Sequence, residues 1–314
     1  MARYVAQRLL GAIPLLVIVS IITFALVLLL PGDPAITIAG DAASEGTIAA
    51  IRERLGENDP LVERYVSWVG GVLHGDFGTS LFSETTVADA IWQRTPMTLS
   101  LTIVSLAIAL LISLPTGLLA GLRPNTVLDR TLTVGTSMGV AIPSFWMGLL
   151  LSVIFAVKTD LLPAIGYVGL TEDPVEWLRH LVLPAFSLGL ASSATLTRQL
   201  RSSVITAMQQ DYIRTARAKG LRQRSVVFKH LLKNASMPAV TALGLQIPVL
   251  LSGTVIIEGL FGLNGIGQFA VSAVMRRDLH VVQAVVLLSA VVVVFVNIAV
   301  DVSYAFLNPK TRLR

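Results

Sequence analysis

The chain has 314 residues, of which 54% are hydrophobic and only 14% are charged, and its mean hydropathy is +0.75. Because soluble domains carry about 25% charged residues, this composition excludes an ordinary soluble protein and predicts an integral membrane protein. The chain contains no cysteine, which excludes disulfides, thiolate metal sites and a cysteine nucleophile. The net charge of +5 is explained by membrane orientation, so no nucleic-acid partner is expected.

Six uncharged apolar segments predict six transmembrane helices, since a hydrocarbon core of about 30 Å needs roughly 20 helical residues. The first segment, residues 9–30, is longer than the roughly 7–15 apolar residues of a signal peptide, so we expect an uncleaved span. The fourth is short and rich in Ala, Ser, Thr and Gly, which suits close helix packing or a pore lining. After the first, the segments are 95–122, 131–157, 181–197, 234–257 and 279–300.

The distribution of positive charge predicts the side of the membrane on which each connection lies. With the N-terminus inside, the inside segments hold 16 of the 24 Lys and Arg residues. Positive charge is enriched on the cytoplasmic side of membrane proteins, so we expect both termini to be cytoplasmic. Residues 198–233 alone hold nine of these cations, which makes this connection the most basic part of the chain.

The connection between the first two spans, residues 31–94, is too long for a simple loop. Apolar residues recur at helical spacing over residues 47–73, and Asn58, Asp59 and Pro60 interrupt them. This pattern predicts two short helices in a small extracytoplasmic cap, with a merely solvated loop as the alternative.

Prolines within the spans predict kinks or local unwinding of the helices. A packing kink is the simplest account of any one of them, but Pro143 and Pro248 are candidates for positions beside a translocation path. Polar and aromatic residues of the spans extend this candidate path; they are Trp146, Ser192, Ser193, Thr195 and Gln246.

The chain lacks the motifs of common enzymes. It has no nucleotide-binding sequence G-x-x-x-x-G-K-[ST], no H-E-x-x-H and no G-x-S-x-G, and its four histidines show no ligand spacing. We therefore expect neither enzymatic activity nor a metal or cofactor site. The spans are almost free of ionisable residues, which disfavours an ion-coupled carrier and indicates an external energy source. Glu258 and Asp301 lie at span ends, where we expect interfacial water to reach them.

The most basic connection predicts a docking element made of two helices and a glycine. Residues 203–219 contain strong helix formers and end at Gly220, a residue suited to a left-handed C-cap. A second helical segment, residues 222–233, is expected before Pro238 begins the fifth span. Such an element suits a groove in a partner protein; a basic helix lying on anionic lipid is the alternative.

The first of these helices is expected to have two different faces. Helical spacing places Tyr212, Ile213 and Ala216 on one apolar stripe. It directs Arg214, Arg217 and Lys219 elsewhere.

Residues 212–221 (YIRTARAKGL) resemble the Glu-Ala-Ala loop of bacterial ABC-importer permeases, in the peptide and nickel branch. Further matches extend the resemblance over essentially the whole chain: residues 30–34 (LPGDP), 75–80 (GDFGTS), 94–99 (RTPMTL), 162–166 (LPAIG), 183–185 (LPA) and 258–267 (EGLFGLNGIG). The chain departs from the family pattern at three places. The name-giving Glu is Thr215, no Pro occurs near Lys233, and a frequent Pro-Gly pair is replaced by Asn264 and Gly265.

The resemblance implies an all-α integral membrane protein with six transmembrane helices, in the type I ABC-importer permease fold. It implies a tail and first helix at 1–30, an extracytoplasmic insertion at 31–94, a transmembrane type-1 domain at 95–307 with a coupling loop at 198–235, and a cytoplasmic tail at 308–314. In this family the loop forms a cytoplasmic coupling helix that docks on an ATPase. The matching positions here are Tyr212, Arg214, Thr215, Ala216, Arg217, Lys219, Gly220 and Leu221.

The same resemblance assigns family motifs to the outer loops, at Gly32, Asp33, Pro34, Gly75, Asp76, Gly78, Glu258, Gly265 and Gly267. It implies a permease subunit of the bacterial cytoplasmic membrane that imports di- or oligopeptides. Nickel chelates, glutathione or another small solute are the alternatives. The implied partners are a second homologous permease, two ATPase subunits, an extracytoplasmic binding protein and membrane lipid. ATP and Mg would be used by the ATPases, with no cofactor bound by this chain.

Overall fold

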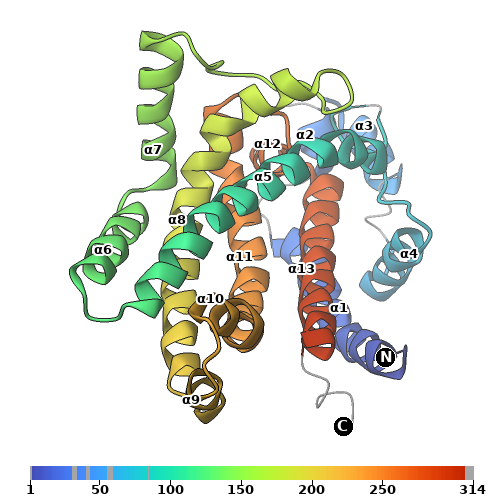
Figure 1. Ribbon diagram of the computed structural model, residues 1–314. Coiled ribbons are helices and arrows are strands. Elements are labelled where there is room, and N and C mark those ends of the chain that lie inside the picture. Colours follow the sequence, from blue (N-terminus) through green and yellow to red (C-terminus); the bar gives the residue numbers. More distant parts are fainter. Residues whose placement is uncertain (1, 30–33, 40–42, 55–58, 84, 308–314) are drawn as a thin grey trace. The chain divides into compact units, whose positions relative to one another are not determined.

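The computed structural model describes residues 2–29, 34–39, 43–54, 59–83 and 85–307, shown in Figure 1. In this part of the chain the regular structure is helical and contains no strand. The described residues form two compact units. The first is built mainly from residues 96–268 and 295–307, and the second from residues 6–95 and 269–294.

The first unit is organised around α8, a helix of 35 residues that packs against α6, α7 and α11. Most of the span in α8 is buried by neighbouring helices. The first turns of α5, before residue 96, belong to the second unit. The main elements of the first unit are the rest of α5 (Val87–Leu122), α6 (Val127–Ala141), α7 (Ser144–Leu151), the π-helical segment η1 (Ser152–Lys158), α8 (Pro174–Met208), α9 (Asp211–Ala218), α10 (Gln223–Ser225), the π-helical segment η2 (Val226–Leu231) and α11 (Leu232–Leu260).

Small residues bring α5 and α8 into close contact. A Cβ atom at Gly121 would lie 2.7 Å from the Val204 side chain, and one at Gly189 would lie 2.6 Å from the carbonyl oxygen of Ser105. Ser192 and Ser193 are buried in the same helix. The prediction that the fourth span packs closely is therefore confirmed, although the helix is much longer than the segment 181–197.

The second unit contains the first span and the short helices that follow it. Its elements are α1 (Ala2–Leu29), α2 (Pro34–Ala39), α3 (Glu45–Arg54), α4 (Leu61–Leu73), most of α12 (Ile266–Arg276) and the larger part of α13 (Leu279–Leu307). The two helices predicted within residues 47–73 are confirmed as α3 and α4. The hydropathy pattern did not indicate α2.

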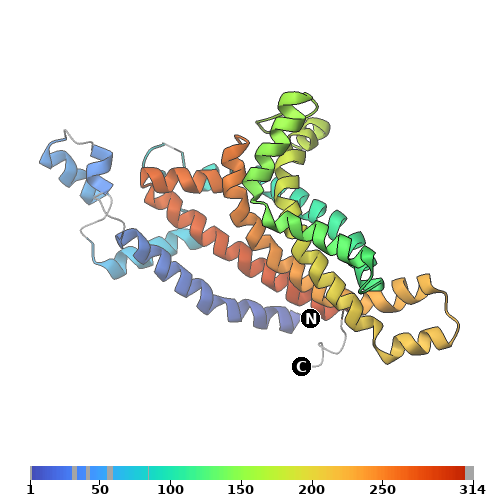
Figure 2. The ribbon, with the colours of Figure 1, turned by 90° about the vertical axis from the view of Figure 1, so that its left-hand side faces the viewer.

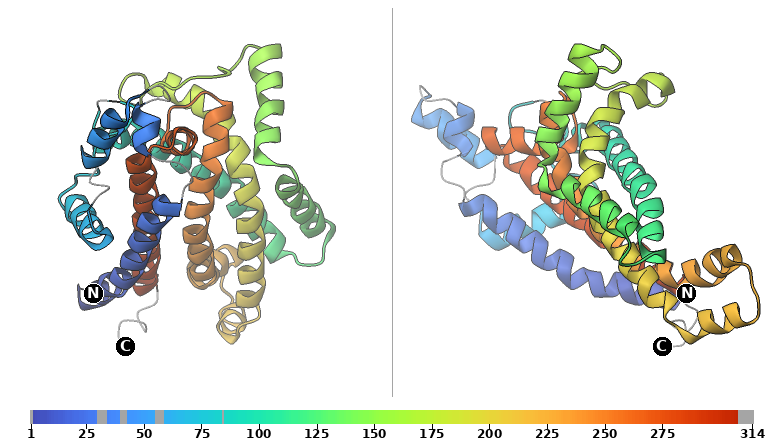
Figure 3. Two further views of the ribbon diagram at one scale, coloured as in Figure 1. Left: turned by 180° about the vertical axis from the view of Figure 1, so that it is seen from behind. Right: turned by 60° about the vertical axis from the view of Figure 1, so that its left-hand side comes forward.

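Five described helices are long and apolar enough to cross a membrane, and a sixth span exists only if α6 and α7 with η1 are counted together. These two helices bend by 95° between residues 141 and 144, as Figure 3 shows. The span predicted over 131–157 is therefore divided into two helices, and the kink or local unwinding predicted at span prolines is confirmed at Pro143. The cause is Pro143, which disfavours the helical conformation in the preceding residue, and Ile142 is accordingly extended (ψ 121°).

In the basic connection, one predicted boundary is wrong and another is confirmed for the span but not for its helix. The helix expected over 203–219 is divided, because α8 ends at Met208 and Gln210 is extended before α9 begins. The candidate fifth span runs from Pro238 to Leu260, as predicted, but its helix begins earlier, since η2 runs directly into α11 and Pro238 lies inside that helix. Figure 2 shows α9 and the following helical segment as two short helices joined by a loop beyond the ends of α8 and α11.

Candidate functional site

The candidate coupling site is α9, an eight-residue helix held by apolar packing on one side. Ile213 and Ala216 are buried, and they belong to a cluster with residues of α8 and η2 that includes Val204, Val226 and Leu231. The predicted apolar stripe is confirmed for these two residues. It is wrong for Tyr212, whose side chain is 38% exposed because it lies at the edge of the buried face.

The exposed sides of α9 present cations to solvent. Arg214, Arg217 and Lys219 are exposed, as the helical spacing predicts. Thr215, at the position of the name-giving Glu, is also exposed and donates its hydroxyl to the carbonyl oxygen of Asp211 at 3.0 Å. Leu221 follows the helix as a partly exposed apolar residue. The site therefore combines an apolar side, which is packed against α8 and η2, with exposed sides that carry positive charge.

A glycine turn ends α9 in a defined direction. Gly220 has φ of +73°, and its N–H donates to the carbonyl oxygen of Arg217 at 2.9 Å, while the N–H of Leu221 donates to that of Ala216 at 3.3 Å. These two bonds form a Schellman motif, in which the left-handed residue is usually glycine. The predicted left-handed C-cap at Gly220 is confirmed, and the turn sets the angle between α9 and α10.

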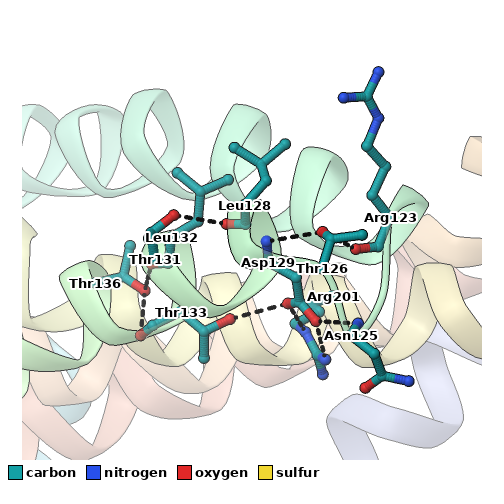
Figure 4. A network of polar contacts seen from close by, with 10 residues as sticks. All are labelled: Arg123, Asn125, Thr126, Leu128, Asp129, Thr131, Leu132, Thr133, Thr136 and Arg201. Carbon is teal, nitrogen blue, oxygen red and sulfur yellow. Dashed lines mark hydrogen bonds and ion pairs between the residues drawn. The ribbon is translucent and has the colours of Figure 1, made fainter.

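An ion pair joins α8 to α6 about two turns before α8 ends. Arg201 Nε and Nη2 donate to the two carboxylate oxygens of Asp129 at 2.5 and 2.7 Å, as Figure 4 shows. Asp129 also accepts the backbone N–H of Asn125 at 2.8 Å and the hydroxyl of Thr133 at 3.3 Å. The Asp129 side chain is almost fully buried, so the pair is a specific connection between two helices.

Sequence reasoning missed this ion pair because it treated Arg201 only as one of the cations that indicate orientation. The pairing depends on two residues 72 positions apart, and no local pattern connects them. The one available signal is the acidic residue Asp129 within a basic connection.

The Glu258 cluster, defined as Thr98, Glu258, Ile266 and Gln268, lies at the other end of α11. Glu258 accepts the Thr98 hydroxyl at 3.0 Å and the Gln268 N–H at 2.7 Å, while Thr98 accepts the Ile266 N–H at 2.9 Å. Two side chains from α5 and α11 thus satisfy N–H groups in the first turn of α12, which no helical carbonyl can reach. The expectation that water reaches Glu258 is wrong, because this residue is fully buried.

The glycines of this motif make room for the carboxylate. A Cβ atom at Gly265 would lie 2.5 Å from Glu258 Cδ, and one at Gly267 would lie 2.9 Å from Glu258 Oε2 and from the Val255 Cα. The structure therefore brings together Glu258, Gly265 and Gly267, three residues that the family motif singled out, and gives each a packing reason.

The motif at residues 75–80 folds against the start of α13 in the second unit. Gly75 and Gly78 have φ of +82° and +81°, and Asp76 accepts the Gly78 N–H at 2.8 Å. Ser80 donates to Asp278 at 2.5 Å, and His280 Nδ1 lies 2.9 Å from the Thr79 carbonyl oxygen. Gly32 and Asp33 lie outside the described residues, as does the tail at 308–314, while Pro34 begins α2.

The candidate path residues are not gathered on one open surface of the described chain. Ser193 is fully buried and donates to the Leu190 carbonyl oxygen, and Ser192 and Gln246 are also buried. Trp146 is exposed on α7 and Thr195 is half-buried on α8, while Pro143 stands at the break between α6 and α7. Pro248 lies inside α11 without ending it.

A separate polar cavity of about 600 Å³ lies beside α9, between the last turns of α8 and the first turns of α11. Its lining includes Gln199, Ser202, Thr206, Gln210, Tyr212 and Asn234. Among the described residues no group of His, Asp or Glu side chains is arranged to hold a metal ion.

The helix arrangement defines a multi-pass membrane protein of the importer-permease fold. A chain of the MetNI methionine ABC transporter in inward-facing conformations has this fold, with a TM-score of 0.57 over 70% of this chain and 96% of that chain, at 20% identity. At this level of sequence identity, the match shows a shared fold only.

Residues 113–313 match the model of the binding-protein-dependent transport system inner membrane component, and residues 1–102 match the N-terminal model of the same kind of component. The chain therefore belongs to this family of transport-system permeases, as the resemblance predicts.

Curated relatives agree over nearly the full length. The oligopeptide transport system permease protein AppB of Bacillus subtilis (strain 168) is 40% identical, with 99% of each chain covered. The putative peptide transport system permease protein BAB2_1050 of Brucella abortus (strain 2308) is 38% identical, again over 99% of each. The glutathione transport system permease protein GsiC of Escherichia coli (strain K12) is 39% identical over 100% of each.

Proposed function

We propose that this permease subunit imports di- and oligopeptides, driven by ATP hydrolysis on separate ATPase subunits that contact α9. The observation that carries the proposal is the construction of α9. Ile213 and Ala216 anchor the helix, while Arg214, Arg217 and Lys219 face solvent beside the fixed turn at Gly220. The sequence contains no nucleotide-binding motif of its own, which supports an energy source on another subunit.

The proposed assembly contains a second homologous permease, two ATPase subunits and an extracytoplasmic binding protein in the bacterial cytoplasmic membrane. The α9 end lies in the cytoplasm together with both chain termini. The nine cations within residues 198–233 support this orientation. ATP and Mg act at the ATPases, and this chain holds no cofactor.

Alternating access follows from how α9 is attached. Two residues separate α9 from the end of α8, and α10 with η2 connects it to α11. An ATPase that moves α9 would therefore displace α8 and α11 as rigid bodies, and the Asp129–Arg201 pair would carry the displacement of α8 to α6. When the two ATPases close around bound ATP, the translocation path opens to the outside. ATP hydrolysis then returns the path to its inward-facing state.

The translocation path is proposed to run along accessible side chains of this subunit towards the polar cavity beside α9. Trp146 and Thr195 fit such a path because they are at least partly accessible, and the cavity supports an opening at this end. The buried residues Ser192, Ser193 and Gln246 would act on the path by packing, and Pro143 by the bend that it produces.

Peptides are the proposed substrate class because two full-length relatives are named for peptide transport. Glutathione is the second candidate, since a relative of nearly equal identity is named for its transport. Nickel chelates remain an alternative from the resemblance to the branch. The discriminating measurement is uptake of labelled dipeptide, pentapeptide and glutathione by the reconstituted importer with its binding protein. Uptake of glutathione alone would contradict the peptide assignment.

The coupling role of α9 is tested at Gly220. A Cβ atom there would meet nothing within 4 Å, so a substitution acts through the backbone angle alone. Valine in a left-handed conformation costs about 1–3 kcal/mol. We expect Gly220→Val to reduce ATP-driven uptake roughly tenfold, while the ATPases still hydrolyse ATP.

Two controls make the Gly220 experiment specific. Gly220→Asn should retain most of the uptake, because Asn tolerates φ above zero. Gly135→Val places the same side chain in α6, where a Cβ atom also meets nothing within 4 Å and φ is helical, so it should leave coupling unchanged. Normal uptake by Gly220→Val, or uptake by the wild type after ATP depletion, would contradict the proposed function.

A further inference from the structure

The helix α4 in the second unit has three distinct sides. Tyr65 and Trp68 face α1, where each ring contacts Phe24. Glu63 and Ser67 form an exposed polar side. Val62, Val66 and Leu73 form a third side, which we call the α4 apolar face, and they are 73%, 62% and 79% exposed.

The contact with α1 places α4 at a particular depth. The Tyr65 hydroxyl lies 2.7 Å from Ser20 Oγ, and the Phe24 and Tyr65 rings meet edge to face with centroids 5.5 Å apart. Ser20 and Phe24 belong to the candidate span Ala6–Ala25. Both residues lie in the second half of that span, which is the outer half in the proposed orientation. A helix in contact with them lies against the membrane-spanning part of α1 and not in bulk water.

The chemistry of α4 agrees with this depth. The helix has no fully buried residue, so its apolar residues are not there to form a protein core. The α4 apolar face carries no charge, and the aromatic residues Tyr65 and Trp68 are of the kind that gather where bilayer and water meet. A helix with separate apolar and polar sides, attached to the outer half of a membrane span, has the properties of an interfacial amphipathic helix.

We propose that α4 is an interfacial helix whose apolar face, Val62, Val66 and Leu73, lies among the lipid acyl chains beside α1. The inference rests on α1 crossing the membrane, and the orientation proposed above assigns α4 to the outer leaflet. The predicted extracytoplasmic cap is then only partly aqueous, since its second helix belongs to the bilayer surface. Lipid is favoured over a protein partner because the face adjoins a membrane span that is itself exposed beside the contact, at Val17 and Ile21, which share one side of α1 with Ser20 and Phe24.

The absence of cysteine from the sequence permits a direct test with single labels. Val66→Cys and Ser67→Cys are neighbouring exposed positions on the apolar and polar sides of α4, so they form a matched pair. Each variant is assembled in the full importer, labelled with the fluorophore NBD and placed in phosphatidylcholine nanodiscs. Quenching is measured with 5-doxyl phosphatidylcholine in the disc and with aqueous iodide. Val62→Cys provides a second label on the apolar face.

We expect doxyl lipid to quench the labels at 66 and 62 several-fold more than the label at 67, and iodide to show the reverse order. Equal iodide quenching at 66 and 67 would overturn the proposal in favour of a solvated cap. If the label at residue 66 is protected from both quenchers, or if its quenching changes when the binding protein is added, the proposal is overturned in favour of a protein contact. Uptake is measured for the same variants. Normal uptake with a water-exposed residue 66 would reject the lipid contact and leave the proposed function standing.

Discussion

The α9 site and the Glu258 cluster place charge in opposite ways. In α9 the apolar residues Ile213 and Ala216 point inward, and Arg214, Arg217 and Lys219 are exposed. In the Glu258 cluster the charged residue is fully buried, and its oxygens accept a hydroxyl and a backbone N–H. An exposed cation needs no partner within the chain, whereas a buried carboxylate is tolerated only when hydrogen bonds satisfy it.

The difference indicates two kinds of task. The cations of α9 add little to the folding of this subunit, so they are available to a partner that carries negative charge. Glu258 is committed to the chain itself, where it holds the first turn of α12 against α5 and α11. Substitutions should therefore separate the two regions. In the Glu258 cluster they should mainly lower the stability of the folded subunit, and in α9 they should mainly weaken its assembly with the ATPases.

The largest effect on stability is expected for Glu258→Ala. The change leaves the Gln268 N–H without its acceptor in a buried site, which costs about 2–3 kcal/mol. Glu258→Gln should lose less stability, because its amide oxygen still accepts one of the two hydrogen bonds. The measurement is the thermal unfolding midpoint of the purified complex. If Glu258→Ala unfolds at the wild-type temperature, the cluster is not holding the helix.

The second prediction compares two ion pairs by double-mutant cycles. Alanine substitutions at Asp129 and Arg201 should give a coupling energy of about 1.5–3 kcal/mol, because the Asp129 side chain is buried and both oxygens are engaged. Asp211 and Arg214 of α9 approach to 3.5 Å but are 96% and 74% exposed. Their cycle should give less than about 0.5 kcal/mol.

Substitutions in the Asp129–Arg201 pair also test whether the pair helps to couple ATP hydrolysis to transport. If the pair carries the displacement of α8 to α6, Arg201→Ala should lower the number of peptides imported per ATP hydrolysed. A purely structural pair would lower both activities together through loss of folded protein. Equal coupling energies for the two ion pairs would remove the distinction between buried and exposed charge.

The smallest effect on stability is expected for the combined change of Arg214, Arg217 and Lys219 to Ala. The unfolding midpoint should stay near that of the wild type, because all three residues are exposed. Binding of the ATPases should weaken several-fold, and its dependence on salt should decrease, since screened charge attraction is what the change removes. Co-purification at two salt concentrations measures this. Unchanged binding would show that the cations face something other than the ATPase.

Local patterns predicted the features of α9 that depend on neighbouring residues. Helical spacing placed Ile213 and Ala216 on the inner side, and the conformational freedom of glycine identified Gly220 as the end of the helix. The break at Gln209 and Gln210 was missed because it contains neither glycine nor proline. The extent of α8 was missed because Arg198 and Arg201 suggested a loop, whereas Asp129 supplies the charge that allows Arg201 to lie in a packed helix.

The sequence by itself determined that this is a membrane protein with about six spans, a basic connecting segment and the motifs of an importer permease. Each of these conclusions rests on hydrophobicity, charge or short spacing, which the chain carries locally. Only the tertiary structure decided how its buried charges are satisfied. Thr98 is 160 residues from Glu258, and Asp129 is 72 residues from Arg201. The hydrogen bonds that make these groups stable in an apolar interior exist only after the helices have packed.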